Sequence, residues 1–277
     1  MNAHDRARRF HALHQAGMLI LPNAWDAASA ALVAGCGAPA VATTSSGIAW
    51  ALGVPDGENL RRSEMVEAVA RIARVVEVPV SADLEAGYGP EPADVAATIE
   101  AAIDAGASGA NLEDRNRSSD EILWPVDQQG ERLAAARAAA DRRGLPFVLN
   151  ARTDVYLAAV GDPDQREAMT LERARHYQRA GADCLFVPGL LDLAVIERLV
   201  ARSPLPINIM YGPGAGLTIA DLRAAGVRRV SVGQAIASAA YYVVRAAAAQ
   251  LLAGDDTALQ PAIPHREMQR LLTRPAA

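Results

Sequence analysis

The chain has 277 residues, of which 51% are apolar and 21% are charged, and this composition is typical of a folded enzyme and excludes a disordered or fibrous chain. Its formal net charge of −5 at pH 7 provides no basic surface for nucleic acid or for an anionic membrane, and no apolar run reaches the ~18 residues that a transmembrane helix needs. All 27 basic residues are arginines, so the sequence excludes Schiff-base aldolase chemistry, a pyridoxal phosphate lysine and a P-loop lysine.

The cysteine content and the N-terminal segment bear on the cellular compartment. Cys36 and Cys184 are the two cysteines and cannot form a disulfide framework, which favours a reducing environment. The segment 1–17 is charged and amphipathic and lacks the apolar core of a signal peptide. We therefore predict a cytoplasmic protein in which both cysteines belong to the core.

The predicted elements begin with a helix at 3–16, with Phe10 and Leu13 directed inward. Eight apolar runs then predict strands at 18–22, 40–44, 80–84, 110–113, 147–151, 184–187, 207–210 and 229–232. Stretches with helical periodicity lie between most of them, at 26–34, 62–75, 92–105, 131–142, 164–180, 193–201 and 218–225. Eight strands that alternate with helices predict an α/β protein with a (β/α)8 TIM barrel. A doubly wound sheet is the alternative, but no G-x-G-x-x-G motif follows the first strand.

Four Ala-Gly pairs support the barrel, because each closes a predicted helix a few residues before a strand. The pairs are Ala34-Gly35, Ala105-Gly106, Ala180-Gly181 and Ala225-Gly226. Glycine tolerates the left-handed conformation that ends a helix, so the same requirement recurs from unit to unit.

Two further helices are predicted after the eighth strand, at 235–252 and 263–272. A detached C-terminal helix needs an apolar surface to cover, and a neighbouring subunit can supply one. We therefore describe the chain as a single barrel domain, 1–277, with its core at about 17–252 and a C-terminal helical extension at 253–277.

Polar side chains follow the predicted strands at the ends where barrel enzymes hold their catalytic groups. Asp83 and Glu85 are two residues apart at a strand end and so share a face, and Asp56 and Glu113 come from flanking loops. Oxygen ligands without histidine or cysteine nearby suit Mg²⁺ or Mn²⁺. Arg152 provides a fork that matches a carboxylate or an enolate.

Other polar residues are predicted to have structural roles. Asp26 stands directly before a helix and is interpreted as its N-cap rather than as a ligand. Asp114 beside Arg115 is interpreted as a surface pair. The five histidines fall in helices or near the termini, and none ends a strand; they are His4, His11, His14, His176 and His265.

Five motifs carry a resemblance to a known family. They are L-P-N-A-W-D (21–26), S-S-G-I-A-W-A-L-G-V-P-D-G-E (45–58), A-D-L-E-A-G-Y-G (82–89), G-A-N-L-E-D-R (109–115) and N-A-R-T-D (150–154). Together they resemble the phosphoenolpyruvate mutase/isocitrate lyase superfamily, in the right order and from about residue 15 to 250. The resemblance implies a Mg²⁺-dependent barrel that handles 2-oxo or 2-hydroxy acids through a metal-bound enolate. It also implies a homodimer or homotetramer whose subunits exchange C-terminal helices.

The resemblance assigns roles to the residues that match the family's motifs. Asp83 matches the direct metal ligand, and Glu85, Asp56 and Glu113 match ligands that act through water. Arg152 matches the active-site arginine. Further candidates are Ser45, Ser46 and Gly47 in the oxyanion and carboxylate loop, Tyr88 (with Tyr156 and Tyr211 as alternatives) as proton donor, and Trp25, Thr44 and Asn208 as substrate-binding residues.

The chain also departs from the family's pattern. Isocitrate and methylisocitrate lyases carry a catalytic cysteine in a K-[KR]-C-G-H loop after strand four, where this chain reads N-R-S-S-D-E-I-L-W-P-V-D-Q-Q-G. The mutase's Lys/Asn-containing gating loop is missing as well. After strand six, Val187-Pro188-Gly189 stands where the mutase has a histidine. Both well-defined activities are therefore in doubt for this chain.

Because these catalytic residues are missing, we favour a reaction that needs few catalytic side chains from the protein. Decarboxylation or hydrolysis of a 2-oxo acid needs mainly a metal that stabilises the enolate. The hypothesis is a lyase that acts on a small 2-oxo or 2-hydroxy acid and releases pyruvate or a similar product. One alternative is a P–C bond mutase or hydrolase in which Asp56 is the nucleophile or phosphoryl acceptor. Another is a catalytically silent barrel retained for ligand binding.

A long loop is predicted after strand four. The segment 116–130 is polar at both ends and has an apolar middle, Ile122 to Trp124, and the next helix is not expected much before Gly130. One interpretation is a lid that presses Trp124 over the ligand and excludes water. The alternative is that the apolar middle packs on the barrel rim in every state.

Overall fold

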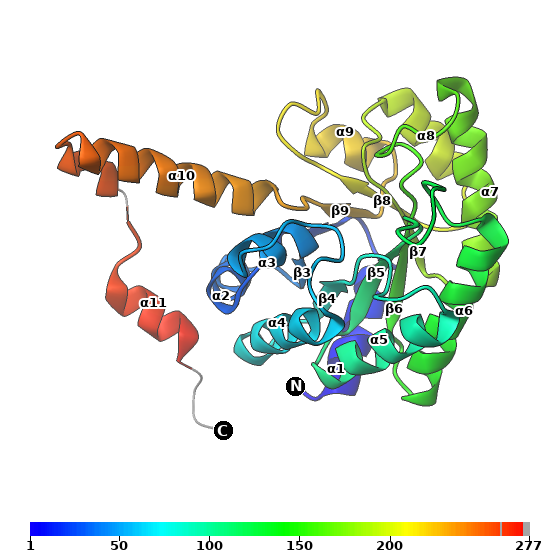
Figure 1. Ribbon diagram of the computed structural model, residues 1–277, viewed down its shortest axis with the longest axis horizontal. Coiled ribbons are helices and arrows are strands. Elements are labelled where there is room, and N and C mark those ends of the chain that lie inside the picture. The colour runs from blue at the N-terminus through cyan, green and yellow to red at the C-terminus, as the bar shows by residue number, and fades with distance from the viewer. Residues whose placement is uncertain (261, 274–277) are drawn as a thin grey trace.

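A nearly closed ring of parallel strands forms the centre of the molecule (Figure 1). The computed structural model describes residues 1–260 and 262–273. Its sheet has nine strands in the order β1-β9-β8-β7-β6-β5-β4-β3-β2. The strand predicted at 18–22 is β1 (Leu19–Leu21). A second short strand, β2 (Asn23–Ala24), lies beyond the predicted bounds and is separated from β1 by Pro22, which has no N–H to donate. The predicted (β/α)8 TIM barrel is confirmed.

The other strands and the helices around them agree with the predicted elements to within a few residues in most cases. The strands are β3 (Val41–Thr43), β4 (Val80–Asp83), β5 (Gly109–Glu113), β6 (Val148–Arg152), β7 (Cys184–Val187), β8 (Ile207–Met210) and β9 (Arg229–Ser231). The helices outside them are α2 (Ala27–Gly35), α4 (Arg62–Val75), α5 (Pro92–Asp104), α6 (Val126–Arg142), α7 (Arg166–Arg179), α8 (Leu193–Arg202) and α9 (Ile219–Ala224). Asp26 is the N-cap of α2, as expected, and its side chain accepts from the amide of Ser29 at 2.7 Å.

The N-terminal helix closes the end of the barrel opposite the candidate site. This helix, α1 (Ala3–Leu13), buries Phe10 completely against strand residues that face the interior, and Leu13 packs on the same cluster. The other buried members of the cluster are Leu19, Leu21, Ala42 and Val148 on strands and Ala40 directly before β3. The predicted inward direction of the two α1 side chains is therefore confirmed.

Three of the four Ala-Gly pairs behave as predicted. Gly106, Gly181 and Gly226 follow their helices with φ between 84° and 97°. The pair at 34–35 does not, because Gly35 still belongs to α2 and the left-handed residue is Gly37, with φ 87°. The repeated helix ending is thus real in the later units and displaced by two residues in the first.

Two segments predicted as loops are helical. The stretch that begins Ser45-Ser46-Gly47 forms α3 (Ser45–Ala51), and Gly130 lies inside α6, which starts at Val126 directly after Pro125. The connection after β5 is therefore 114–125, shorter than the predicted 116–130 loop at its C-terminal end. An isolated antiparallel bridge between Arg115 and Leu123 pairs its two sides.

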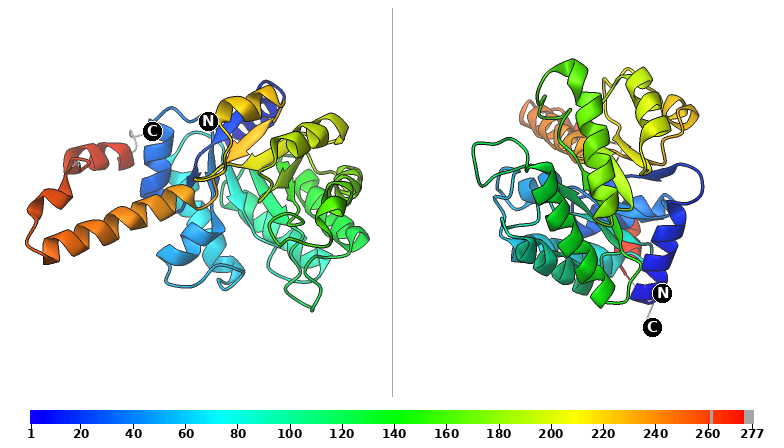
Figure 2. Two further views of the ribbon diagram at one scale, coloured as in Figure 1. Left: turned by 90° about the horizontal axis from the view of Figure 1, so that it is seen from above. Right: turned by 90° about the vertical axis from the view of Figure 1, so that its right-hand side faces the viewer.

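The C-terminal segment leaves the barrel (Figures 1 and 2). Helix α10 (Ala235–Leu252) projects away from it, with Ala237 as its single fully buried residue, and α11 (His265–Leu272) returns toward α2. By length and composition alone α10 is also apolar enough to cross a membrane, which corrects the expectation that no run in the chain reaches that length. The predicted extension to residue 277 includes 261 and 274–277, which lie outside the described residues.

Of the two cysteines, Cys184 on β7 is buried as predicted, whereas Cys36 is exposed. The prediction for Cys36 was wrong because the residue follows the last turn of α2, where the chain turns at the surface before β3. Each has a free thiol.

Candidate active site

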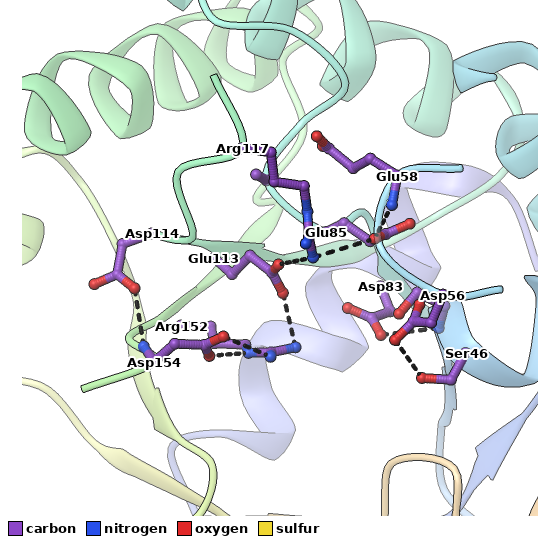
Figure 3. Close-up of polar contacts among 12 residues, drawn as sticks. Ser46, Asp56, Glu58, Asp83, Glu85, Glu113, Asp114, Arg117, Arg152 and Asp154 are labelled. Carbon is purple, nitrogen blue, oxygen red and sulfur yellow. Dashed lines mark hydrogen bonds and ion pairs between the residues drawn. The ribbon is translucent and has the colours of Figure 1, made fainter. Parts of the chain in front are cut away.

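The predicted carboxylates and the arginine meet at the carboxyl ends of three adjacent strands (Figure 3). Asp83 ends β4, Glu113 ends β5 and Arg152 ends β6, and the register places Glu113 opposite Arg152. Asp56 reaches the same place from the loop after α3, and Ser46 from α3 itself. Because parallel strands align their carboxyl ends, residues far apart in the sequence converge here.

A small cavity lies between these groups. Its volume is 140 Å³, which leaves room for a small ligand such as a short organic acid. Its lining residues are Asn23, Thr44, Ser45, Ser46, Asp56, Asp83, Asn111, Arg152, Leu157, Phe186, Met210, Ser231, Gly233 and Gln234.

Asp83 is the buried carboxylate with a free oxygen. Its Oδ2 accepts from the amide of Ser45 at 2.9 Å, and its own amide donates to Thr43 Oγ1 at 2.8 Å. Its Oδ1 is buried and has no hydrogen-bond partner among the described residues. A buried carboxylate oxygen without a donor is costly unless a cation or a ligand satisfies it.

Glu85 lies just beyond the strand, and its geometry differs from the prediction. With φ 50° it has left the extended conformation, so the argument that it shares a strand face with Asp83 does not apply. Its Oε2 accepts from the amide of Glu58 at 2.5 Å and its Oε1 from the hydroxyl of Tyr88 at 3.0 Å. Burial, together with the nearby charges of Asp56 and Asp83, raises the pKa of Glu85 to about 7.

Glu113 is buried between two arginines. Its Oε2 lies 2.8 Å from Nη1 of Arg152, and its Oε1 lies 3.1 Å from Nη2 of Arg117. Burial raises its pKa to about 8 in spite of both arginines, and the charges of Asp154 and Asp83 add to the rise. The carboxyl group of Glu113 is therefore harder to ionise than a free glutamate, in spite of its two ion pairs.

Arg152 is held as a rigid fork. Its Nε and Nη2 donate to the two oxygens of Asp154 at 2.6 and 3.0 Å, and Nη1 pairs with Glu113. Burial alone would lower the pKa of this arginine, but Glu113 and Asp154 raise it above its ordinary value. Since a guanidinium has five N–H groups, two remain to bind a substrate anion.

A second buried hydrogen-bond network lies next to Arg152 and holds the backbone of Asp154. Asp114 is fully buried and accepts from Arg173 Nη1 at 3.0 Å, from the hydroxyl of Tyr177 at 2.8 Å and from the amide of Asp154 at 2.8 Å. The interpretation of Asp114 as a surface partner of Arg115 was therefore wrong. Asp114 fixes the backbone next to Arg152 instead.

The start of α3 supplies donors and the side chain of Ser46. Ser46 Oγ donates to Asp56 Oδ2 at 2.7 Å. The amide of Ser45 is taken by Asp83, which leaves the amides of Ser46 and Gly47 in the first turn of the helix for a ligand oxygen. A Cβ at Gly47 would lie 2.7 Å from Trp25 Cβ, so only glycine permits this close approach.

Six of the predicted site residues are outside the cavity lining, and they are Trp25, Gly47, Glu85, Tyr88, Glu113 and Asn208. Trp25 lines a separate space of 690 Å³ beside α2, α3 and α4. Asn208 is fully buried and lies 3.4–3.5 Å from Ser231 Oγ, and Tyr88 points to Glu85. Thr44, by contrast, does line the cavity.

Two residues that the sequence reasoning missed belong to the site. Asp154 could have been found from its spacing, because it lies two residues after Arg152 at a strand end. Arg117 lies in the loop after β5, and nothing in the sequence fixes where a loop residue folds back.

The loop 114–125 packs on the rim of the barrel. Trp124 lies under the guanidinium of Arg132, 4.5 Å from the ring centre, and its amide donates to the carbonyl of Asp114 at 2.8 Å. This is the arrangement expected if the apolar middle packs in every state. Closure of the segment as a lid stays a prediction.

The donor set fits a magnesium ion held largely through water. Within residues 1–260 and 262–273, no three carboxylate, histidine or cysteine side chains converge closely enough to bind one metal ion directly. Mg²⁺ retains several waters and needs only one or two carboxylates, so the free oxygen of Asp83 with surrounding carboxylates at longer range meets its requirements.

Comparison with known proteins identifies the family. The model of the phosphoenolpyruvate phosphomutase family matches residues 10–252. An uncharacterised protein of Mycobacterium tuberculosis is 37% identical over 95% of both chains. The 2-methylisocitrate lyase of Salmonella typhimurium is 32% identical over 82% of this chain and 78% of its own, and oxaloacetate decarboxylase 2 of Pseudomonas fluorescens is 32% identical over 66% and 62%.

Solved structures support the same family assignment. A protein of Burkholderia cenocepacia assigned as a phosphonomutase is 44% identical, covers 91% of this chain and 100% of its own, and superposes with a TM-score of 0.84. A phosphonopyruvate hydrolase in complex with oxalate and Mg²⁺ is 26% identical, covers 96% and 94%, and has a TM-score of 0.82. From the match over most of its length, the chain belongs to the phosphoenolpyruvate phosphomutase family.

Proposed function

We propose that the protein is a Mg²⁺-dependent carbon–carbon lyase that acts on a small 2-oxo or 2-hydroxy carboxylic acid by cleavage or decarboxylation and releases pyruvate or a similar product. The observation that carries this proposal is the free, buried oxygen of Asp83 facing the fork of Arg152 across a cavity of 140 Å³. A cation on Asp83 and the guanidinium of Arg152 would bind two oxygen atoms of one small acid in this cavity.

Each residue of the site has a role in this proposal. Asp83 holds the metal (Mg²⁺ or Mn²⁺), and Glu85, Asp56 and Glu113 act on it through water. When bound, the ion polarises the 2-oxo oxygen and stabilises the negative charge of the enolate. Arg152 binds the substrate carboxylate with its two remaining N–H groups, and the amides at the start of α3 receive a second oxygen. The substrate would lie beside Thr44, Ser45, Ser46 and Gly47.

The reaction class follows from what the chain lacks. Its loop after β5 contains no cysteine, lysine or histidine that could act as the lyases' catalytic group. A decarboxylation requires an electron sink and a proton for the product. It therefore needs fewer catalytic side chains than the cleavage of a 2-hydroxy acid does. Relatives named 2-methylisocitrate lyase and oxaloacetate decarboxylase support an acid of this class as the substrate.

A P–C bond reaction is the second candidate, and one observation favours it. Ser46 Oγ positions the carboxylate of Asp56 at the cavity, where it could attack or receive a phosphoryl group. The Burkholderia structure assigned as a phosphonomutase adds support. This reaction would use the same metal and the same arginine.

The proposal includes the assembly and the compartment. We propose a homodimer or homotetramer in which α10 and α11 pack on a neighbouring subunit, because α10 exposes Tyr242, Val243 and Val244 along its length. The two free thiols suit a reducing cytoplasm.

The test is a Mg²⁺-dependent screen of oxaloacetate, substituted malates, citrates and phosphonopyruvate. We expect turnover of a carboxylic acid that disappears with EDTA and in Asp83→Asn. Turnover of phosphonopyruvate alone would favour the second candidate. If pyruvate with Mg²⁺ in D₂O gains no deuterium at its methyl group and no substrate in the panel reacts, the lyase proposal fails.

A further inference from the structure

A buried arginine lies in the barrel interior beneath the site. Arg229, the first residue of β9, is fully buried, and its Nη2 donates to Ser81 Oγ and to Asn111 Oδ1, each at 3.1 Å. Its Nη1 lies 3.4 Å from Nε2 of His14. No described carboxylate forms an ion pair with it, so neutral oxygen and nitrogen atoms hold this cation.

The tautomer of His14 follows from its two contacts. Its Nδ1 lies 2.8 Å from the carbonyl oxygen of Phe10, and a carbonyl can only accept. Nδ1 therefore carries the proton and Nε2 accepts from Arg229. Burial, and then the charge of Arg229, lower the pKa of His14 to about 4, so the ring is neutral at pH 7.

Asn111 connects this arginine to the active site. Its Oδ1 receives two donors, Nη2 of Arg229 and Nδ2 of Asn150 at 2.7 Å. Both partners can only donate through these atoms, so the amide oxygen of Asn111 must face them and its Nδ2 must face the other way. Asn111 is 4% exposed and lines the 140 Å³ cavity, and its Nδ2 has no acceptor in the described part of the chain.

We propose that Asn111 is a specificity-determining residue, which donates its Nδ2–H to a carboxylate or enolate oxygen of the substrate, and that Arg229 is its positioning residue. This inference rests on the proposed function and names a contact within that site. An N–H that faces the cavity without a protein acceptor favours a ligand that brings an oxygen to it and rejects an analogue that brings a methyl group there.

The buried charge makes the donor more effective. The guanidinium withdraws electron density through the amide oxygen, and hydrogen bonds in such a chain strengthen one another in a low-dielectric interior. Because Arg229 and Asn150 fix the amide before substrate arrives, the donor needs no reorganisation when negative charge develops.

The first test is Asn111→Asp, which changes one atom type and the charge. One carboxylate oxygen keeps the contacts with Arg229 and Asn150 and gives the arginine a counter-ion, so we expect the thermal midpoint to stay equal or rise. The other oxygen replaces the donor. At saturating Mg²⁺, calorimetric titration should show oxalate binding weakened about tenfold or more, as for the loss of a hydrogen bond to a charged group.

A double-mutant cycle tests the positioning role. Arg229→Met should weaken oxalate binding roughly fivefold in the wild type and have no further effect in Asn111→Ala, because the arginine acts through that amide. The matched control is Leu185→Val, which alters a fully buried side chain of the main hydrophobic core that does not line the cavity. It should leave oxalate binding unchanged.

The outcomes are separable. An unchanged oxalate affinity in folded Asn111→Asp overturns the role of Asn111, and additive effects of Arg229→Met and Asn111→Ala overturn the positioning role. If the wild type fails to bind oxalate with Mg²⁺, the proposed function itself is wrong, and this assignment with it.

Discussion

At single carboxyl groups of this site, burial and ion pairing have opposite effects on the pKa. Glu113 touches Arg152 and Arg117 yet has its pKa raised, because complete burial outweighs the two cations while Asp83 and Asp154 lie nearby. Asp83 is likewise buried, with one oxygen free. The site therefore buries carboxyl groups whose ionised form a divalent cation would stabilise.

The metal prediction concerns Asp83. Asp83→Ala should abolish Mg²⁺ binding, measured by calorimetry or by Mn²⁺ electron paramagnetic resonance, because it removes the direct ligand of the proposal. Glu85→Gln and Glu113→Gln should weaken binding by roughly tenfold, as expected for groups that act through water. Full activity of Asp83→Ala at low Mg²⁺ would contradict the assignment.

The pH prediction concerns the metal-free protein. Between the ordinary value of 4.5 and about 8, folded Glu113 keeps a proton that the unfolded chain has released, and Glu85 does so up to about 7. These two groups make the folded state bind more protons, so their contribution to stability falls as the pH rises through this window. Buried His14 has the opposite effect below its ordinary pKa of 6.5. Thermal midpoints measured in EDTA from pH 6.5 to pH 8 should therefore decline, and Glu113→Gln should flatten the decline. A midpoint that rises over this range would contradict the cause given for the pKa shifts.

The sequence predicted part of this site for a physical reason. Asp83, Glu113 and Arg152 could be placed together because parallel strands bring their carboxyl ends to one edge. Arg117 could not be placed, because a loop residue's position depends on tertiary contacts. Asp114 was misplaced because an acidic residue beside an arginine gives no sign of burial.

At the scale of elements, strands were easier to predict than the short helix of the site. Buried parallel strands appear as continuous apolar runs, so β7 and β8 were predicted at their observed bounds. The helix α3 was missed because its first turn contains Ser45, Ser46 and Gly47, which have low helix propensity. Tertiary packing against Trp25 decides its conformation.

Gly47→Ala tests that packing. The new Cβ would lie 2.7 Å from Trp25 Cβ and 2.8 Å from Thr44 Cγ2, so α3 must shift with its free amides. We expect a lower thermal midpoint and weaker oxalate binding at saturating Mg²⁺, although alanine is the better helix former. Gly130→Ala in α6 is the matched control, because nothing lies within 4 Å of its Cβ position and it should stabilise by up to about 1 kcal/mol. Equal effects of the two substitutions would refute the packing argument.

At the scale of the whole molecule, the barrel is complete but the C-terminal helices extend from it. Helix α10 buries little against its own barrel and leaves Leu252 91% exposed. The sequence predicted the helix at its observed bounds but not its direction, because an amphipathic pattern does not specify which surface it will meet. An isolated apolar helix in water is unfavourable, which is why a neighbouring subunit is proposed to cover it.

Deletion of 258–277 tests the proposed assembly. Without α11 the neighbouring subunit would lose part of its contact, so light scattering should show a smaller oligomer than for the whole chain. Leu252→Asp, which places a charge on the exposed face of α10, should act in the same direction. An unchanged mass in both variants would count against helix exchange.

The pairing of the first two strands has a consequence for synthesis. β1 pairs with β9 and β2 pairs with β3, so the ring closes only where Leu19 meets Arg229. More than two hundred residues, on the order of the whole barrel, separate these partners, and such distant contacts form late. A ribosome releases the N-terminal strands first, at about 5–20 residues per second. The nascent chain therefore carries an unpaired β1 edge until β9 has emerged, and such an edge can pair with another chain.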